Sequence, residues 1–264
     1  MGGMTRLLLL LLWVGVTVST AVDLQKRIYG GHVCKDDERQ YHVMVIGNNG
    51  THDFLCGGSL ISNRWILTAA HCEKKVMTPY LGVHPGRNLG TPGAIKSNKI
   101  YKKWKLIKRS KEHDIMLLEL DNPSGIKPVD LPTTKECKDR KKILSFQIAG
   151  FMNRTLDSQN KIVDHESDTL QCADMEAVDC KKYLDCIKKE QADFHKEHSF
   201  QHLLCGKSSV ASTTPGDSGG GVVHNKKIYG VISFGRFRPR CVHYNAYMDV
   251  CEYLPWIKKT TGIP

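Results

Sequence analysis

The stretch SVASTTPGDSGGG, from Ser209 to Gly221, contains two features that decide most of what the sequence predicts. Its second half, Gly216-Asp217-Ser218-Gly219-Gly220, is typical of a loop around a nucleophilic serine, because glycines allow a sharp turn and a close backbone approach. Its first half, Ser212-Thr213-Thr214-Pro215, is an unusual lead into such a loop. The second half predicts a catalytic serine, and the first half leaves the substrate preference open.

Two distant segments supply the partners that a serine nucleophile needs. His71 lies in Leu67-Thr68-Ala69-Ala70-His71-Cys72, after an apolar run, and Asp114 begins the apolar run Asp114–Leu120. A serine hydroxyl is a weak nucleophile unless a base removes its proton, and a carboxylate can orient that base and stabilise its charged form. Each residue alone has an ordinary structural explanation. Their joint order, His, Asp, Ser, predicts a catalytic triad of His71, Asp114 and Ser218.

Further motifs follow one another in a consistent order along the chain. They are RIYGG at Arg27–Gly31, CGGSLISNRW at Cys56–Trp65, SFG at Ser233–Gly235 and WIKK from Trp256. Together with the triad motifs, they make the chain from Ile28 to its C-terminus resemble the trypsin/chymotrypsin-like serine peptidases. The resemblance extends to both the kallikrein branch and the granule proteases, and it does not separate them.

The resemblance implies an all-β fold with one peptidase domain at 28–264. Two six-stranded antiparallel β-barrels would occupy about 28–137 and 138–250, and a short helix would follow at about 253–260. The hydrophobic residues support strands independently, because they come in short Val- and Ile-rich runs between turn residues. One other segment, 179–191, has a helical pattern.

The N-terminal segment predicts export. Met1–Arg6 is short and basic, residues 7–18 are almost wholly apolar, and small residues precede Val22. This pattern is typical of a signal peptide at 1–21, whose apolar run is too short to span a membrane. The mature chain is expected to be secreted without a membrane anchor, and storage in secretory granules stays open.

A short basic segment predicts activation by proteolysis. Lys26-Arg27 immediately precedes Ile28, so residues 22–27 are interpreted as an activation propeptide. In the family that the chain resembles, the α-amino group released by this cleavage pairs with a carboxylate beside the nucleophile, which here is Asp217. A buried carboxylate without a partner would be costly. The chain is therefore expected to be a zymogen that a trypsin-like protease cleaves after Arg27.

The resemblance also locates the oxyanion hole and the substrate pocket. The N–H groups of Gly216 and Ser218 would stabilise the tetrahedral intermediate. Ser212 would form the pocket floor, where trypsin-like enzymes carry aspartate, so cleavage after Arg or Lys is not expected. The remaining pocket residues would be Thr213, Ser233, Phe234, Gly235 and Asn245, and Ser233 would also help to hold Asp114. A preference for Phe, Tyr or Leu is the simplest interpretation, with small or polar side chains next.

The ten cysteines are consistent with export, because oxidising compartments permit disulfides. The resemblance implies three bridges: Cys34–Cys172, Cys56–Cys72 and Cys137–Cys251. It also implies that Cys205 pairs with either Cys180 or Cys186. Thr214 stands where a pocket cysteine is common, and the even total then leaves Cys241 for the other of the two.

The charge of the chain and its short motifs indicate which binding partners and modifications to expect. The formal charge of the whole chain is +11, and removing residues 1–27, with three basic residues and one acidic residue, leaves +9. The basic run Lys96–Lys111 could bind heparin-like polyanions, although a solvated surface loop is the favoured interpretation. Nucleic acid is not an expected partner of an exported protein. Asn49 and Asn153 begin Asn-X-Thr glycosylation acceptors.

The sequence predicts no metal and no cofactor. In particular, residues 82–95, which would form the calcium loop of trypsins, contain no Asp or Glu to bind the ion. The leading function is a secreted, monomeric serine endopeptidase that acts on protein or peptide substrates and is controlled by protease inhibitors. The alternative is a catalytically weak or silent homologue that acts as a binding or regulatory protein. The altered pocket motivates this alternative, and the complete triad argues against it.

Overall fold

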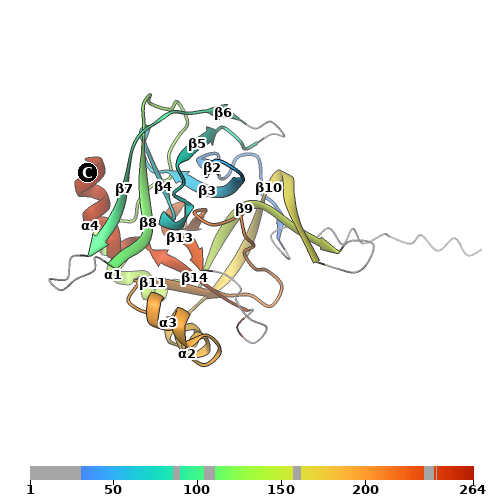
Figure 1. The fold of residues 1–264 in the computed structure, drawn as a ribbon. Helices are drawn as coiled ribbons and strands as arrows, with labels where there is room; N and C mark the ends of the chain where they lie inside the picture. The colour runs from blue at the N-terminus through green and yellow to red at the C-terminus, as the bar shows by residue number, and fades with distance from the viewer. Residues whose placement is uncertain (1–30, 86–89, 104–110, 157–161, 235–240, 242) are drawn as a thin grey trace, which may run out of the picture.

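Two antiparallel β-sheets dominate the computed structural model, which describes residues 31–85, 90–103, 111–156, 162–234, 241 and 243–264 (Figure 1). The first sheet has the order β6-β5-β2-β3-β4-β8-β7. Its strands are β2 (His42–Asn48), β3 (Asp53–Leu60), β4 (Trp65–Thr68), β5 (Val76–Leu81), β6 (Thr91–Pro92), β7 (Ile95–Lys103) and β8 (Lys111–Leu120).

The second sheet has the order β1-β10-β11-β14-β13-β12-β9, and a further pairing of β9 with β10 closes it into a barrel. Its strands are β1 (His32–Val33), β9 (Ser145–Leu156), β10 (Ile162–Val178), β11 (Leu203–Lys207), β12 (Gly221–His224), β13 (Lys227–Phe234) and β14 (Tyr244–Asp249). The predicted all-β fold is confirmed. Among the described residues each sheet has seven strands, because the two-residue strands β1 and β6 add to the expected six.

Four α-helices lie among the described residues, and two of them follow the sequence prediction. These two are α2 (Cys180–Glu190) and the C-terminal α4 (Val250–Thr261), which begins a few residues earlier than expected. The other two are α1 (Thr134–Asp139) and α3 (Ala192–His198). Helix α1 begins with a reciprocal capping box between Thr133 and Glu136. None of the helices in the described ranges is long and apolar enough to cross a membrane.

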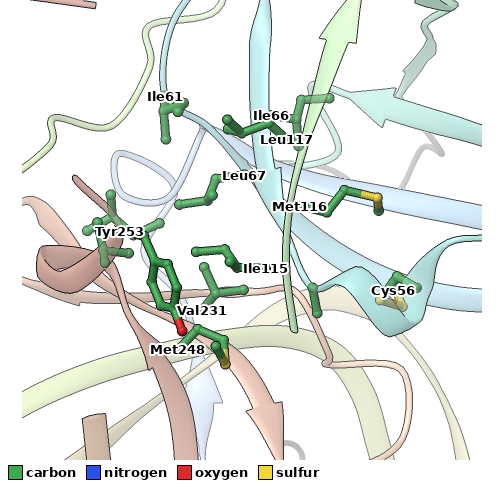
Figure 2. Close-up of a cluster of buried hydrophobic side chains, with 14 of the residues drawn as sticks. Cys56, Ile61, Ile66, Leu67, Ile115, Met116, Leu117, Val231, Met248 and Tyr253 are labelled. Carbon is green, nitrogen blue, oxygen red and sulfur yellow. A yellow bond between two sulfur atoms is a disulfide. The ribbon is translucent and has the colours of Figure 1, made fainter. Parts of the chain in front are cut away.

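A shared hydrophobic core joins the two sheets. Leu67 of β4 and Ile115 of β8 belong to the same cluster of buried side chains as Val231 of β13 and Met248 of β14. Figure 2 shows Ile115 lying next to Val231, with Met248 close by. Burying such aliphatic side chains is the main favourable term in folding, so the two sheets stabilise each other through this contact.

Five disulfides join all ten cysteines of the chain. They are Cys34–Cys172, Cys56–Cys72, Cys137–Cys251, Cys180–Cys205 and Cys186–Cys241. In the structure Cys205 pairs with Cys180, and Cys241 pairs with Cys186. These are the two pairings that the sequence left open.

A buried arginine fixes the N-terminal segment to the second sheet. The Arg39 guanidinium donates hydrogen bonds to the side chain of Gln147 at 3.0 Å, to the Gln147 carbonyl at 2.7 Å and to the Gly221 carbonyl at 3.1 Å. Burial lowers the pKa of Arg39 below its usual value. Because carbonyl and amide oxygens replace the lost water, the cation can stay in the interior.

Acid should selectively destabilise the fold through His42, which lies buried near Arg39. Burial, followed by the charge of Arg39, lowers the pKa of His42 to about 3. The His42 imidazole therefore takes up a proton at a higher pH in the unfolded chain than in the folded one. The contribution of neutral His42 to the free energy of unfolding is complete above pH ~6.5 and is lost as the pH falls toward ~3. Between pH 8 and pH 5, the wild type is expected to lose about 2 kcal/mol more unfolding free energy than His42→Gln.

Urea denaturation of both proteins at the two pH values measures this difference. His32→Gln, which removes an exposed histidine of β1, is the matched control and should follow the wild type. Equal losses in the wild type and in His42→Gln would contradict the prediction.

Candidate active site

The predicted histidine and aspartate come from neighbouring elements of the first sheet. Strand β4 leads into a 3-10 helix, η1 (Ala70–Cys72), which carries His71, and β8 carries Asp114. Strands β4 and β8 pair directly, with Thr68 opposite Met116. The Cys56–Cys72 disulfide fixes the helix to β3. Strand pairing and this disulfide therefore bring the two side chains together.

Asp114 holds His71 at two points. One carboxylate oxygen of Asp114, Oδ1, accepts the backbone N–H of His71 at 2.8 Å, and the other, Oδ2, lies 2.8 Å from His71 Nδ1. Ser233 Oγ also donates to Oδ2. Asp114 is only 7% exposed, whereas His71 is exposed. With Nδ1 facing a carboxylate, the proton sits on Nδ1 and the Nε2 atom is left to act as a base.

The predicted nucleophile approaches from the second sheet. Ser218 precedes β12, and its carbonyl accepts the backbone N–H of Gly57 in β3 at 2.7 Å, which ties the loop to the first sheet. Ser218, His71 and Asp114 line one cavity of about 640 Å³. In the described part of the chain, no hydrogen bond joins Ser218 Oγ to His71. Such contacts often form only when substrate is bound.

The loop before the nucleophile forms a tight turn. The N–H of Asp217 donates to the Thr214 carbonyl at 3.1 Å, and Gly216 has a φ of 102°. Pro215 followed by a residue with positive φ is the pattern of a type II turn, in which proline presets its own φ and glycine adopts the left-handed one. The predicted oxyanion residue Gly216 therefore has a conformation that its sequence favours.

Asp217 is fully buried and has several donors. Its Oδ1 accepts the N–H of Met152 at 3.1 Å, and its Oδ2 accepts both the N–H and the hydroxyl of Thr214, each at 2.9 Å. The other predicted activation residues, Arg27 and Ile28, lie outside the described residues.

The predicted pocket residues divide into two groups. Thr213, Ser233 and Phe234 line the cavity with the triad. Ser212 and Asn245 do not line it; both are buried, and Asn245 is 0% exposed. The Asn245 side-chain oxygen accepts the Thr213 hydroxyl at 2.8 Å and its N–H at 3.4 Å. Asn245 therefore contacts the cavity through Thr213, while Gly235 lies outside the described residues.

Several residues that line the cavity were not predicted, among them Gln201, Phe194 and His198. Gln201 accepts the backbone N–H of Asp114 at 3.0 Å. Phe194 and His198 of α3 stack with ring centroids 4.0 Å apart, and both pack edge-on against Phe234. The only sequence signal for this wall is the helical pattern that ends at residue 191, just before α3 begins.

The remaining predicted sites lie away from the cavity. Asn49 is exposed, and its side-chain oxygen accepts the N–H of Thr51 at 3.0 Å. Asn153 is in β9. Within the basic run 96–111, Lys96 forms an ion pair with Glu119 at 3.3 Å, and residues 104–110 lie outside the described part. Residues 86–89 of the predicted calcium-free loop also lie outside it.

Comparisons with known proteins identify the family of the chain. The Trypsin family profile matches residues 28–257. Serine protease 1 of Rattus norvegicus is 30% identical over 259 residues, covering 96% of this chain and 97% of the rat protein. Putative trypsin-6 of Homo sapiens is 32% identical over 267 residues, covering 96% and 97% of the two chains.

Solved structures show the same fold. The structure of GrC has a TM-score of 0.68 and 21% identity, and the match covers 89% of this chain and 99% of that one. Since the profile match extends over most of the sequence, and the His, Asp and Ser motifs meet at one cavity, the chain belongs to the trypsin family of serine endopeptidases.

Proposed function

We propose that the protein hydrolyses internal peptide bonds of proteins or peptides through His71, Asp114 and Ser218. One observation carries the proposal: the Asp114 carboxylate accepts the backbone N–H of His71 and faces its Nδ1 atom, both at 2.8 Å, in the cavity that Ser218 also lines. This arrangement leaves His71 Nε2 to act as the base for Ser218.

The residues would divide the chemistry as follows. As Ser218 Oγ attacks the peptide carbonyl carbon, its proton passes to His71 Nε2, and Asp114 stabilises the resulting imidazolium. The N–H groups of Gly216 and Ser218 would stabilise the negative oxygen of the tetrahedral intermediate. His71 then donates its proton to the leaving amine, and an acyl-enzyme forms. Water, deprotonated by His71, attacks this ester and releases the acid and Ser218.

The proposal includes secretion and activation by proteolysis. A signal peptide at 1–21 and cleavage after Arg27 by a trypsin-like protease would release the α-amino group of Ile28 to pair with Asp217. The complete burial of Asp217 supports this step, because a buried carboxylate is stabilised by a cationic partner. Protease inhibitors would act at the same cavity, as expected of a secreted endopeptidase.

The substrate side chain at the cleavage site is proposed to be small, which revises the sequence-based preference for Phe, Tyr or Leu. The Asn245 side chain accepts a hydrogen bond from the hydroxyl of Thr213, which lines the cavity, and both Asn245 and Ser212 are buried. A large aromatic side chain would have to displace this buried pair. Hydrogen-bonded polar groups in the interior resist such displacement, because a broken partner is left unsatisfied.

Asn245→Gly should open the pocket. The ratio of kcat/KM for peptides cleaved after Phe to kcat/KM for peptides cleaved after Ala is expected to rise at least about tenfold, since apolar pocket contacts discriminate on this scale. Paired chromogenic peptides that differ only at this position measure the ratio. Asn225→Gly, in an exposed turn with φ of 47°, is the matched control. An unchanged ratio would show that Asn245 does not limit the pocket.

The test of the proposed function is labelling by a fluorophosphonate probe. The chain cleaved after Arg27 should form a covalent adduct at Ser218, as identified by peptide mass analysis, and it should hydrolyse small peptide substrates. Absence of Ser218-dependent labelling would overturn the proposal.

A second candidate is a catalytically weak homologue that acts as a binding or regulatory protein. The bond between Asn245 and Thr213 favours it, because a pocket that admits no substrate side chain would bind substrate weakly even where the serine can react with the probe. Probe labelling without cleavage of any member of a peptide library would support this candidate over the endopeptidase.

A further inference from the structure

Thr214 has an unusual relation to Asp217. Its backbone N–H and its hydroxyl both donate to Asp217 Oδ2 at 2.9 Å, while Asp217 N–H donates back to the Thr214 carbonyl at 3.1 Å. Thr214 is 5% exposed and Asp217 is 0% exposed. A hydrogen bond to an ionised acceptor in such a site is stronger than one between neutral groups. Thr214 thus closes the turn through its backbone and through its side chain.

The surroundings leave the carboxylate little freedom to leave this position. Strand β9 packs directly on the carboxylate at Gly150, which has no side chain. A methyl group at this position would lie 2.1 Å from Asp217 Oδ1. Met152 of the same strand donates to that oxygen at 3.1 Å. Pro215 presets the backbone of the turn between Thr214 and Asp217. The packing of Gly150, the hydrogen bond from Met152 and the fixed φ of Pro215 therefore hold the oxyanion turn, Thr214–Asp217, in one conformation.

The disulfide pattern makes this role possible for Thr214. Cys241 is joined to Cys186 of α2, so no disulfide constrains position 214. Residue 214 is a threonine, and its hydroxyl donates a hydrogen bond to Asp217.

We propose that Thr214 is a positioning residue that holds the oxyanion turn by its bonds to Asp217, and that it does so before activation cleavage as well as after it. In the uncleaved chain these bonds stabilise the carboxylate without the ammonium of Ile28. The oxyanion N–H groups of Gly216 and Ser218 are then partly organised in the precursor, which has measurable activity. This inference rests on the proposed function, since it concerns the same serine and the same activation step.

The test compares cleaved and uncleaved forms of the full chain. Arg27→Gln blocks the proposed cleavage, and Thr214→Val removes the hydroxyl while keeping the shape of the side chain. Thr214→Ser restores the hydroxyl, and Thr214→Ala is a second variant without it, so the result does not depend on the folding of one variant. The rate constant for fluorophosphonate labelling of Ser218 is the readout, and urea denaturation reports the stability of each protein.

In the Arg27→Gln background, Thr214→Val and Thr214→Ala are expected to slow labelling about ten- to hundredfold, the equilibrium value of one hydrogen bond to a charged group. Thr214→Ser should label at about the rate of the unsubstituted precursor. In the cleaved chain the loss should be less than about fivefold, because the Ile28 ammonium then shares the stabilisation of Asp217.

Equal slowing of the cleaved and uncleaved forms would overturn the inference, because it would show only a general structural role for Thr214. The inference would also fail if the cleaved wild type is labelled and the Arg27→Gln precursor is not. If neither form is labelled, the proposed function itself fails, so the two failures can be told apart.

Discussion

Ser218→Ala is expected to lower kcat for peptide hydrolysis by about a millionfold, since the loss of a serine nucleophile from an intact triad has an effect of this size. The covalent path through the acyl-enzyme is removed, while the turn that presents Gly216 remains. KM should change little, because the hydroxyl contributes little to ground-state binding. Steady-state hydrolysis of a small chromogenic peptide by the chain cleaved after Arg27 measures the effect.

Ser209→Ala is the matched control, because Ser209 is exposed and lies a few residues earlier on the same segment. It should retain the wild-type rate. If Ser218→Ala kept more than about one part in a thousand of wild-type turnover, a level above the residual catalysis expected of such a site, Ser218 would not be the nucleophile.

The second large effect concerns the partner of the histidine. Asp114→Asn is expected to lower kcat about ten-thousandfold near neutral pH, because an amide can donate to His71 Nδ1 and so place the histidine proton on the wrong nitrogen. The two bonds from His71 at 2.8 Å and the bond from Ser233 make Asp114 the centre of the site, so overall geometry should persist.

Asp121→Asn, an exposed carboxylate just after β8, is the control and should leave kcat unchanged. The pH–rate profile separates a tautomer effect from a folding defect, because a proton on the wrong nitrogen changes the pH dependence of kcat, whereas a folding defect lowers the amount of active protein. A loss that is the same at every pH would count against the proposed role of Asp114.

The sequence was sufficient to predict the fold and the contact between His71 and Asp114, because these depend on short motifs whose backbone requirements are strict. His71 lies in a 3-10 helix that a disulfide fixes to the sheet, and Asp114 lies in β8, which pairs with β4, the strand that leads into this helix. Strand pairing and this disulfide fix both placements, which is why local motifs could predict them.

The wall and the base of the pocket could not be predicted in the same way. Helix α3 is a single short element, and such helices are marginal on their own, so its formation depends on the packing of Phe194 and His198 against Phe234. Asn245 was expected at the pocket, but its bond to the Thr213 hydroxyl depends on side-chain conformations that residue type does not fix. The pairing of Cys241 needed the position of α2.

The division of the site between the two sheets has a consequence for when the protein can act. His71 and Asp114 belong to the first sheet, whereas Ser218 and Ser233 belong to the second, and the Gly57–Ser218 bond lies between them. If His71 and Ser218 act as proposed, a chain that has emerged only as far as the first sheet holds the base without the nucleophile. Peptide hydrolysis would then begin only after both sheets have docked, so a nascent or partly unfolded chain would not digest its neighbours.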